Sequence, residues 1–341
     1  MTPEIDASAL RGDAPTQPRA SRSADALLGD PPVRTGRGRA TGKVILLGEH
    51  SVVYGHPAIA LPITSISARA EATTTTQASR VDSALFHGLL SSAPDRLRPT
   101  VTAVRAALGT DDPALGGVHV RIDSDIPSER GVGSSAAVAA AVVSAVSQAR
   151  GRTLTPDERF DLVQDAERAA HGSPSGLDAR AVCASGPIWF RRGTVEHISV
   201  GAPLHLVVAD SGVRGRTREA VESVRALKQS SPAVFDHAIS ALSALTTRAR
   251  IQISDGDVEG LGTTMDDAHR HLGVLGVGDR ALDHLATAAR AAGAPGAKLT
   301  GGGRGGCILA LAHDPDHAAE LVARLRTAGA PAAWTTHMEI A

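Results

Sequence analysis

Residues 127–137 read Pro-Ser-Glu-Arg-Gly-Val-Gly-Ser-Ser-Ala-Ala, and a run rich in alanine and valine continues to about residue 150. This run has the composition of a helix and few polar side chains, so we expect a buried helix. Glycines let backbone N–H groups turn inward, and a helix N-terminus adds unpaired N–H donors and a positive dipole end. The stretch therefore predicts a loop suited to a phosphate group. A purely structural glycine turn before a helix gives the same pattern.

The elements around this loop predict a mixed α+β chain. An apolar run over 43–47 leads into a polar loop at 48–50, followed by a strand-like stretch through Val52 and Val53 to Ile63. Apolar residues alternate over 118–122. Thr155-Pro156-Asp157-Glu158 is a capping box that predicts a helix to about residue 170. Further on, helical patterns over 217–228, 232–250, 280–292 and 315–328 mix with strand patterns over 204–209, 307–312 and 332–339.

Length and charge limit the classes of function. The chain has 341 residues, which predicts about two domains, and 35 basic against 36 acidic side chains give a formal charge of −1. Such a balance argues against nucleic acid or an acidic membrane as partner. Cys183 and Cys307 form neither a metal spacing nor a disulfide framework, and no apolar run suits a signal or a membrane span. We expect a cytoplasmic protein whose first 37 residues are a disordered tail.

A second glycine motif lies at 301–306, after Lys298-Leu299-Thr300 and before an apolar run. It reads Gly-Gly-Gly-Arg-Gly-Gly, and so many glycines carry a high entropic cost in a folded chain. Close approach of the backbone to a ligand would explain the motif, and a wide hairpin loop is the alternative. The Walker A pattern is matched neither at the first motif nor at Gly42-Lys43, where Val44 follows, and the first motif does not match the dinucleotide fingerprint.

Two carboxylates stand out near residue 170. On the capped helix, Phe160, Val163 and Glu167 share the apolar stripe, so the charge of Glu167 needs a partner there. A salt bridge or a Mg²⁺ ion would provide one. Asp178 follows a loop containing Pro174 and Gly176, where it could accept the proton of a hydroxyl group or simply cap a turn.

The order of these motifs resembles the GHMP kinase superfamily and, within it, the mevalonate kinase family. Residues 42–55 are similar to the first family motif, 127–137 to its phosphate loop and 299–303 to its third motif. The segment 171–178, His-Gly-Ser-Pro-Ser-Gly-Leu-Asp, is the most discriminating, and the resemblance covers about residues 38–336. It implies two α+β domains, over 38–200 and 201–341, with the active site in the cleft between them.

The resemblance also implies roles for individual residues. Asp178 would be the catalytic base and Lys43 would lie beside it, while Ser135 and Glu167 would hold Mg²⁺ on the phosphates of ATP. Glu49, His50 and Thr217 match positions that line the substrate site. The ATP-binding positions would be Glu129, Arg130, Gly131, Val132, Gly133, Ser134, Ser135, Gly302 and Gly303. Arg304 departs from the family pattern, and it would either clash with a phosphate or add a cation to it.

The activity implied by the resemblance is ATP-dependent phosphorylation of (R)-mevalonate on its 5-hydroxyl. Phosphomevalonate, homoserine or a sugar are alternative substrates, and a nucleotide-binding scaffold without catalysis is an alternative of another class. Intact Lys43, Ser135, Glu167 and Asp178 argue against the scaffold. A homodimer is expected from family habit alone.

Overall fold

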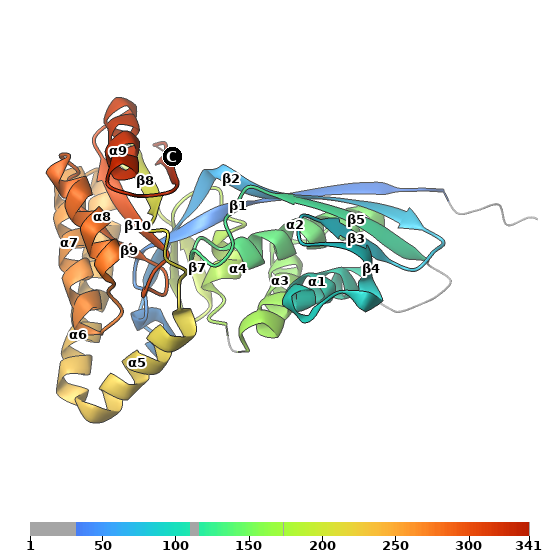
Figure 1. The fold of residues 1–341 in the computed structure, drawn as a ribbon, viewed down its shortest axis with the longest axis horizontal. Helices are drawn as coiled ribbons and strands as arrows, with labels where there is room; N and C mark the ends of the chain where they lie inside the picture. The colour runs from blue at the N-terminus through green and yellow to red at the C-terminus, as the bar shows by residue number, and fades with distance from the viewer. Residues whose placement is uncertain (1–31, 110–115, 173, 341) are drawn as a thin grey trace, which may run out of the picture. The chain divides into compact units, whose positions relative to one another are not determined.

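The computed structural model describes residues 32–109, 116–172 and 174–340. Val33–Ala341 forms one compact unit built on two β-sheets (Figure 1). Of the predicted N-terminal tail, residues 1–31 lie outside the described part. The first strand begins at Thr35, so regular structure starts before the predicted position 38. A domain boundary near residue 200 stays a prediction, although the chain passes from one sheet to the other there.

The larger sheet has seven strands in the order β4-β3-β5-β2-β6-β7, with β1 paired to β2. The long antiparallel pair β1 and β2 runs from beside the smaller sheet to the far end of the larger one (Figure 1). The predicted strand at Val52 and Val53 is wrong, because both lie in a 3-10 turn, η1 (Ser51–Tyr54), that follows left-handed residues Gly48 and His50. The strands are β1 (Thr35–Leu47), β2 (Ala58–Thr75), β3 (Arg80–Ser83), β4 (Phe86–Leu89), β5 (Gly117–Ser124), β6 (Ile188–Arg191) and β7 (Thr194–His197).

Helices α1 (Arg98–Leu108), α2 (Ser134–Ala149), α3 (Pro156–His171) and α4 (Leu177–Ala181) belong to the larger sheet's half, and α2 packs directly on β1 and β2. The predicted capping box is confirmed, because the Thr155 side chain accepts from the Glu158 backbone and the Glu158 side chain accepts from the Thr155 backbone. Helix α2 is nearly all small residues and lies close to β1, where a Cβ atom at Gly36 or Gly38 would overlap its backbone. This close packing fixes the helix that begins at the glycine loop.

The smaller sheet has the antiparallel order β11-β8-β10-β9. Its strands are β8 (Leu204–Asp210), β9 (Ala297–Thr300), β10 (Cys307–Ala312) and β11 (Ala333–Met338). The helices of this half are α5 (Thr217–Ser230), α6 (Pro232–Asp255), α7 (Val258–Val274), α8 (Arg280–Ala291) and α9 (Pro315–Thr327). The sequence patterns had not indicated α7 and β9. Short 3-10 turns η2 (Leu90–Ser92) and η3 (Asp95–Leu97) precede α1.

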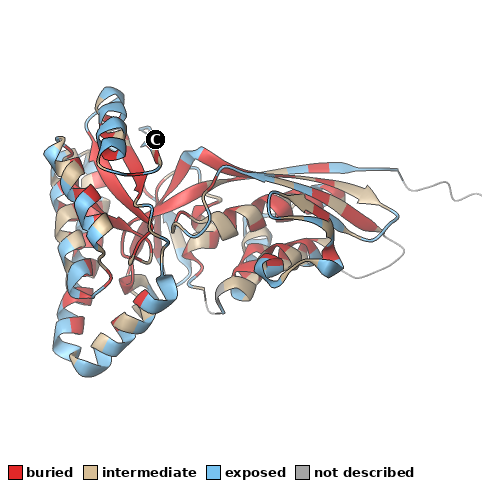
Figure 2. Cartoon of the chain, in the orientation of Figure 1, coloured by how far each residue is buried: buried red, intermediate tan, exposed pale blue. Residues whose placement is uncertain are grey.

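Two buried threonines join the sheets. Thr300 in β9 donates its hydroxyl to the Ile45 carbonyl (2.9 Å) and accepts from the Ile45 N–H (3.1 Å). Thr336 in β11 likewise donates to the Pro62 carbonyl at 3.0 Å. Buried residues run continuously from the strands of the smaller sheet into those of the larger one (Figure 2). The two halves of the chain therefore share one core at the level of β1 and β2.

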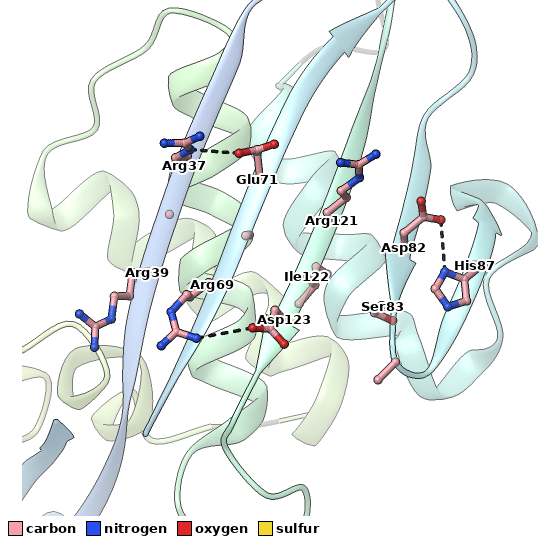
Figure 3. A pocket seen from close by; sticks show the side chains of 13 residues that line it. Arg37, Arg39, Arg69, Glu71, Asp82, Ser83, His87, Arg121, Ile122 and Asp123 are labelled. Atoms are coloured by element: carbon pink, nitrogen blue, oxygen red, sulfur yellow. Dashed lines mark hydrogen bonds and ion pairs between the residues drawn. The ribbon is translucent and has the colours of Figure 1, made fainter. Parts of the chain in front are cut away.

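The exposed face of the larger sheet carries rows of charged residues. Arg37 pairs with Glu71 at 3.0 Å, and Arg69 lies 3.5 Å from Asp123, across neighbouring strands that border a shallow hollow (Figure 3). Exposed pairs of this kind contribute little stability, typically about 0–1 kcal/mol each. We interpret the face as a solvated surface. Within the described part of the chain, no helix combines the length and apolar character needed to cross a bilayer.

Candidate active site

A pocket of about 480 Å³ lies where the glycine loop, β1, the start of α4 and the loop after β9 meet. It is lined by thirteen of the residues predicted from the sequence: Lys43, Glu49, His50, Glu129, Arg130, Gly131, Gly133, Ser134, Ser135, Glu167, Asp178, Thr217 and Gly302. Val132 and Gly303, which were predicted to bind ATP, are not among the lining residues in the described structure. Val132 is instead buried, and its carbonyl accepts from the Lys43 N–H at 3.0 Å.

Lys43 and Asp178 form an ion pair in this pocket. The Lys43 ammonium lies 2.9 Å from Asp178 Oδ1, and the lysine side chain is only 3% exposed while that of Asp178 is 39% exposed. Lys43 is thus a buried charge that is paired with a carboxylate. Gly133 is needed beside it, because a Cβ atom there would lie 2.7 Å from Lys43 Cγ. Asp178 lies in the first turn of α4, whose N-cap is Gly176, so capping does not explain the carboxylate.

The glycine loop presents the N-terminus of α2 to the pocket. Gly131 and Gly133 have φ near +80°, a conformation that side chains disfavour, and α2 starts at the next residue. The loop is anchored to the other half of the chain, because Arg130 pairs with Asp210 at 2.8 Å and Glu129 pairs with Arg214. Free N–H groups at such an end favour an anion.

Ser135 and Glu167 offer oxygen atoms to the same pocket. The Ser135 hydroxyl is buried and has no hydrogen-bond partner among the residues that the structure describes. Glu167 is 2% exposed and comes from α3, whose Phe160 and Val163 lie on the same side, as the helical spacing predicts. A hydroxyl and a carboxylate are the donors that Mg²⁺ prefers beside phosphate oxygens, so these residues fit that ion.

The loop after β9 forms the opposite wall. A Cβ atom at Gly301 would lie 3.4 Å from the Gly131 carbonyl oxygen, so the two glycine loops are in contact. At Gly302 a Cβ atom would lie 2.5 Å from the Thr217 hydroxyl, which places α5 against this loop. Arg304 neither clashes with this space nor lines it, because its guanidinium donates to the Gly276 carbonyl at 3.2 Å.

His50 lies 3.0 Å from the Gly302 carbonyl oxygen through Nε2. Burial lowers the pKa of His50 to about 4, so the ring is neutral near pH 7. A neutral ring that faces a carbonyl must carry its proton on Nε2 and donate it. His50 therefore ties the first motif to the third. Ser173 of the segment 171–178 lies outside the described residues, and so does the side chain of His171.

Sequence reasoning assigned no role to Lys298. Its side chain is fully buried on β9, pairs with the Glu49 carboxylate and donates to the Leu299 carbonyl at 2.7 Å. Burial raises the pKa of Glu49 and lowers that of Lys298, while their mutual attraction opposes both shifts. The sequence feature that could have singled out Lys298 is the rarity of lysine, which occurs only at positions 43, 228 and 298. Arg218, another pocket residue, was also missed.

Comparisons with known proteins show the family of this chain. The model for the GHMP kinases N terminal domain matches residues 96–186, and that for the GHMP kinases C terminal matches 241–331. The mevalonate kinase of Thermococcus sibiricus is 36% identical over 311 residues, which cover 85% of this chain and 92% of that protein. The mevalonate kinase of Pyrococcus furiosus is 35% identical with the same coverage.

Solved structures show the same architecture. The crystal structure of L. major mevalonate kinase in complex with R-mevalonate matches with a TM-score of 0.77 at 27% identity, covering 90% of this chain and 96% of that one. Streptococcus pneumoniae phosphomevalonate kinase, in complex with phosphomevalonate and AMPPNP, has a TM-score of 0.74 over 88% of this chain and 99% of that one. At 17% identity the latter match shows a common fold.

Proposed function

The chain belongs to the mevalonate kinase family of GHMP kinases, and on this premise we propose that it transfers the γ-phosphoryl group of ATP to the 5-hydroxyl of (R)-mevalonate. The products are 5-phosphomevalonate and ADP. The observation that carries the proposal is the buried Lys43 ammonium 2.9 Å from Asp178, in a pocket shared with the glycine loop.

Asp178 and Lys43 activate the alcohol in this proposal. The Asp178 carboxylate accepts the hydroxyl proton while the hydroxyl oxygen forms a bond to the γ-phosphorus. The bond from that phosphorus to the β,γ-bridging oxygen breaks, and its electron pair leaves with ADP. Lys43 stabilises the negative charge that develops on the hydroxyl oxygen and the transferring group. Catalysis of this kind is mostly positioning and electrostatic stabilisation, which a fixed ion pair provides.

The glycine loop binds the triphosphate in this proposal. The N–H groups of residues 131–135 and the N-terminus of α2 provide donors for the phosphate oxygens. Ser135 and Glu167 would hold Mg²⁺, which neutralises phosphate charge when it is bound. Gly302 and Thr217 lie close together and form one wall of the substrate end in this proposal, and His50 and Glu49 also line the pocket.

The cellular location and the oligomeric state of the enzyme are also proposals. A cytoplasmic location fits two free cysteines, one of which, Cys307, is fully buried. A homodimer remains a prediction from the family.

The test measures ADP release with Mg-ATP and a panel of mevalonate, phosphomevalonate, homoserine and galactose. We expect turnover with mevalonate alone. In the Asp178→Asn variant kcat should fall about 10²–10⁴-fold, the usual contribution of general-base catalysis. This variant should still bind ATP. Asp316→Asn, at an exposed carboxylate on α9, is the matched control and should retain wild-type turnover. Turnover with another alcohol would refute the substrate, and an active Asp178→Asn enzyme would refute the base.

A further inference from the structure

A buried aspartate of the smaller sheet pairs with the glycine loop. Asp210 is the last residue of β8 and is 5% exposed, and its Oδ2 atom lies 2.8 Å from Arg130 Nε. Its Oδ1 atom accepts from the Gly212 N–H at 2.8 Å, so both carboxylate oxygens have a fixed partner. Arg130 directly precedes Gly131 and lines the pocket. The pair therefore connects a buried strand to the loop that is proposed to bind the triphosphate.

The backbone of the glycine loop also depends on contacts with the smaller sheet's half. Glu129 has φ +59°, in the left-handed region that is uncommon for a residue with a side chain. Its carbonyl accepts from the Gly215 N–H at 3.1 Å, and its carboxylate pairs with Arg214. A strained conformation persists only where the surrounding structure holds it. The segment 210–215 supplies such contacts, together with the pair at Arg130.

Asp210 reaches the pocket only through Arg130. In the described structure Asp210 is not among the residues that line the pocket, whereas Arg130 is. Within the described part of the chain, the Arg130 guanidinium donates only through Nε, to Asp210, and an arginine has further N–H donors on its two Nη atoms. These donors are available to phosphate oxygens. We propose that Asp210 is a positioning residue for ATP, which holds Arg130 and the backbone of residues 129–133 where they bind the phosphates.

This inference rests on the proposed function, since it needs the glycine loop to bind the triphosphate. The sign of the effect separates positioning from simple electrostatics. A carboxylate repels a triphosphate, so its removal should tighten ATP binding if only the net charge of the site matters. If Asp210 acts by positioning Arg130, its removal should weaken ATP binding instead.

The main test is the variant Asp210→Asn, which removes the charge but keeps an oxygen for the Gly212 N–H. Isothermal titration calorimetry without an alcohol substrate measures Kd for Mg-ATP. We expect this Kd to rise about tenfold or more, which corresponds to the loss of a hydrogen bond to a charged group. KM for mevalonate should change less than about threefold, because the substrate end of the pocket is untouched. An unchanged or lower Kd for Mg-ATP would overturn the inference.

A second comparison tests whether Asp210 acts through Arg130. In an Arg130→Met background, Asp210→Asn should cause no further rise in Kd for Mg-ATP, since residues that act as a unit are not additive. A further rise would mean that Asp210 acts by another route, and the inference would fall. The double variant leaves no lone buried charge, and circular dichroism and thermal melting establish the fold of each variant. If neither variant that lacks Asp210 folds, the pair is required for folding and the inference is rejected.

The control is a similar pair in the same half of the chain. Asp266 pairs with Arg290 at 2.7 Å, and neither residue is among those that line the pocket in the described structure. Asp266→Asn should leave Kd for Mg-ATP unchanged, and a rise equal to that of Asp210→Asn would show a general effect of losing such a pair and refute the positioning role.

The wild type separates this inference from the proposed function. A wild-type chain that does not bind Mg-ATP refutes both. Normal Mg-ATP binding by the wild type and by Asp210→Asn refutes the positioning role alone and leaves the proposed function standing. Turnover of the wild type with an alcohol other than mevalonate refutes the substrate alone, because Kd for Mg-ATP is measured without any alcohol.

Discussion

Replacement of Lys298 by methionine alone leaves the Glu49 carboxylate buried without the cation that contacts it. Removal of one partner of a buried pair typically costs about 3–5 kcal/mol. Native proteins are stable by only about 5–15 kcal/mol, so this is a large fraction of the total. For a chain of 341 residues the loss corresponds to a fall in Tm of roughly 4–7 °C.

The loss should depend on pH. Burial raises the pKa of Glu49, so the folded chain binds this proton at a higher pH than the unfolded chain does. Removal of Lys298 takes away the attraction that opposes this rise. The penalty is therefore full above the raised pKa and shrinks as the pH falls through it, because protonated Glu49 carries no buried charge.

Urea unfolding of the wild type and Lys298→Met at pH 8, 7, 6 and 5 measures this difference. Adding Glu49→Gln to Lys298→Met should restore most of the lost stability at pH 8. Lys228→Met, at an exposed lysine on α5, controls for the loss of a lysine. A penalty independent of pH, or a double variant no more stable than the single one, would refute the reasoning.

Three further predictions concern other pocket residues. Glu167→Gln should raise the Mg²⁺ concentration for half-maximal activity about tenfold or more. Asp161→Asn, at an exposed carboxylate on the same helix, should leave this concentration unchanged. Equal Mg²⁺ titrations for the two variants would contradict the assignment of Glu167. Gly302→Ala should lower kcat/KM about tenfold or more by displacing Thr217. Gly186→Ala, at a position with open space around it, should leave kcat/KM unchanged. A normal kcat/KM for Gly302→Ala would mean that Thr217 can move aside without loss of activity. Because burial lowers the pKa of His50 from its ordinary value near 6.5 to about 4, the unfolded chain binds this proton more readily, and about 3 kcal/mol of stability should be lost as the pH falls through that window. His50→Asn should flatten this part of the pH dependence of urea unfolding, and an unchanged slope would exclude His50 as its cause.

Local signals in the sequence predicted much of the fold near the site. The capping box at Thr155 and the glycine loop before α2 depend on residues close in the chain, so their patterns are read directly. The position of Glu167 on an apolar stripe predicted its burial for the same reason. These elements contain the residues proposed to act on the phosphates.

The features that were missed depend on distant partners. Strand β9 has four residues, too few to show the alternation of apolar and polar residues that marks a strand. The burial of Lys298 depends on its contact with Glu49, 249 positions away in the chain. The start of β1 resembles a tail because it alternates glycine with arginine. Its glycines in fact pack on α2 and its arginines face the charged surface in Figure 3. Neither environment can be seen from the local sequence.

The hydroxyl of Thr300 joins β9 to Ile45, a residue 255 positions earlier in the chain. Contacts between such distant positions form late in folding, because a long loop must close before they contribute. The pocket is therefore expected to form late in folding. The helices and the larger sheet can form before the two walls of the pocket come together. After dilution from denaturant, helical signal should return ahead of catalytic turnover, and a chain caught in between would expose the apolar side of β1 to aggregation.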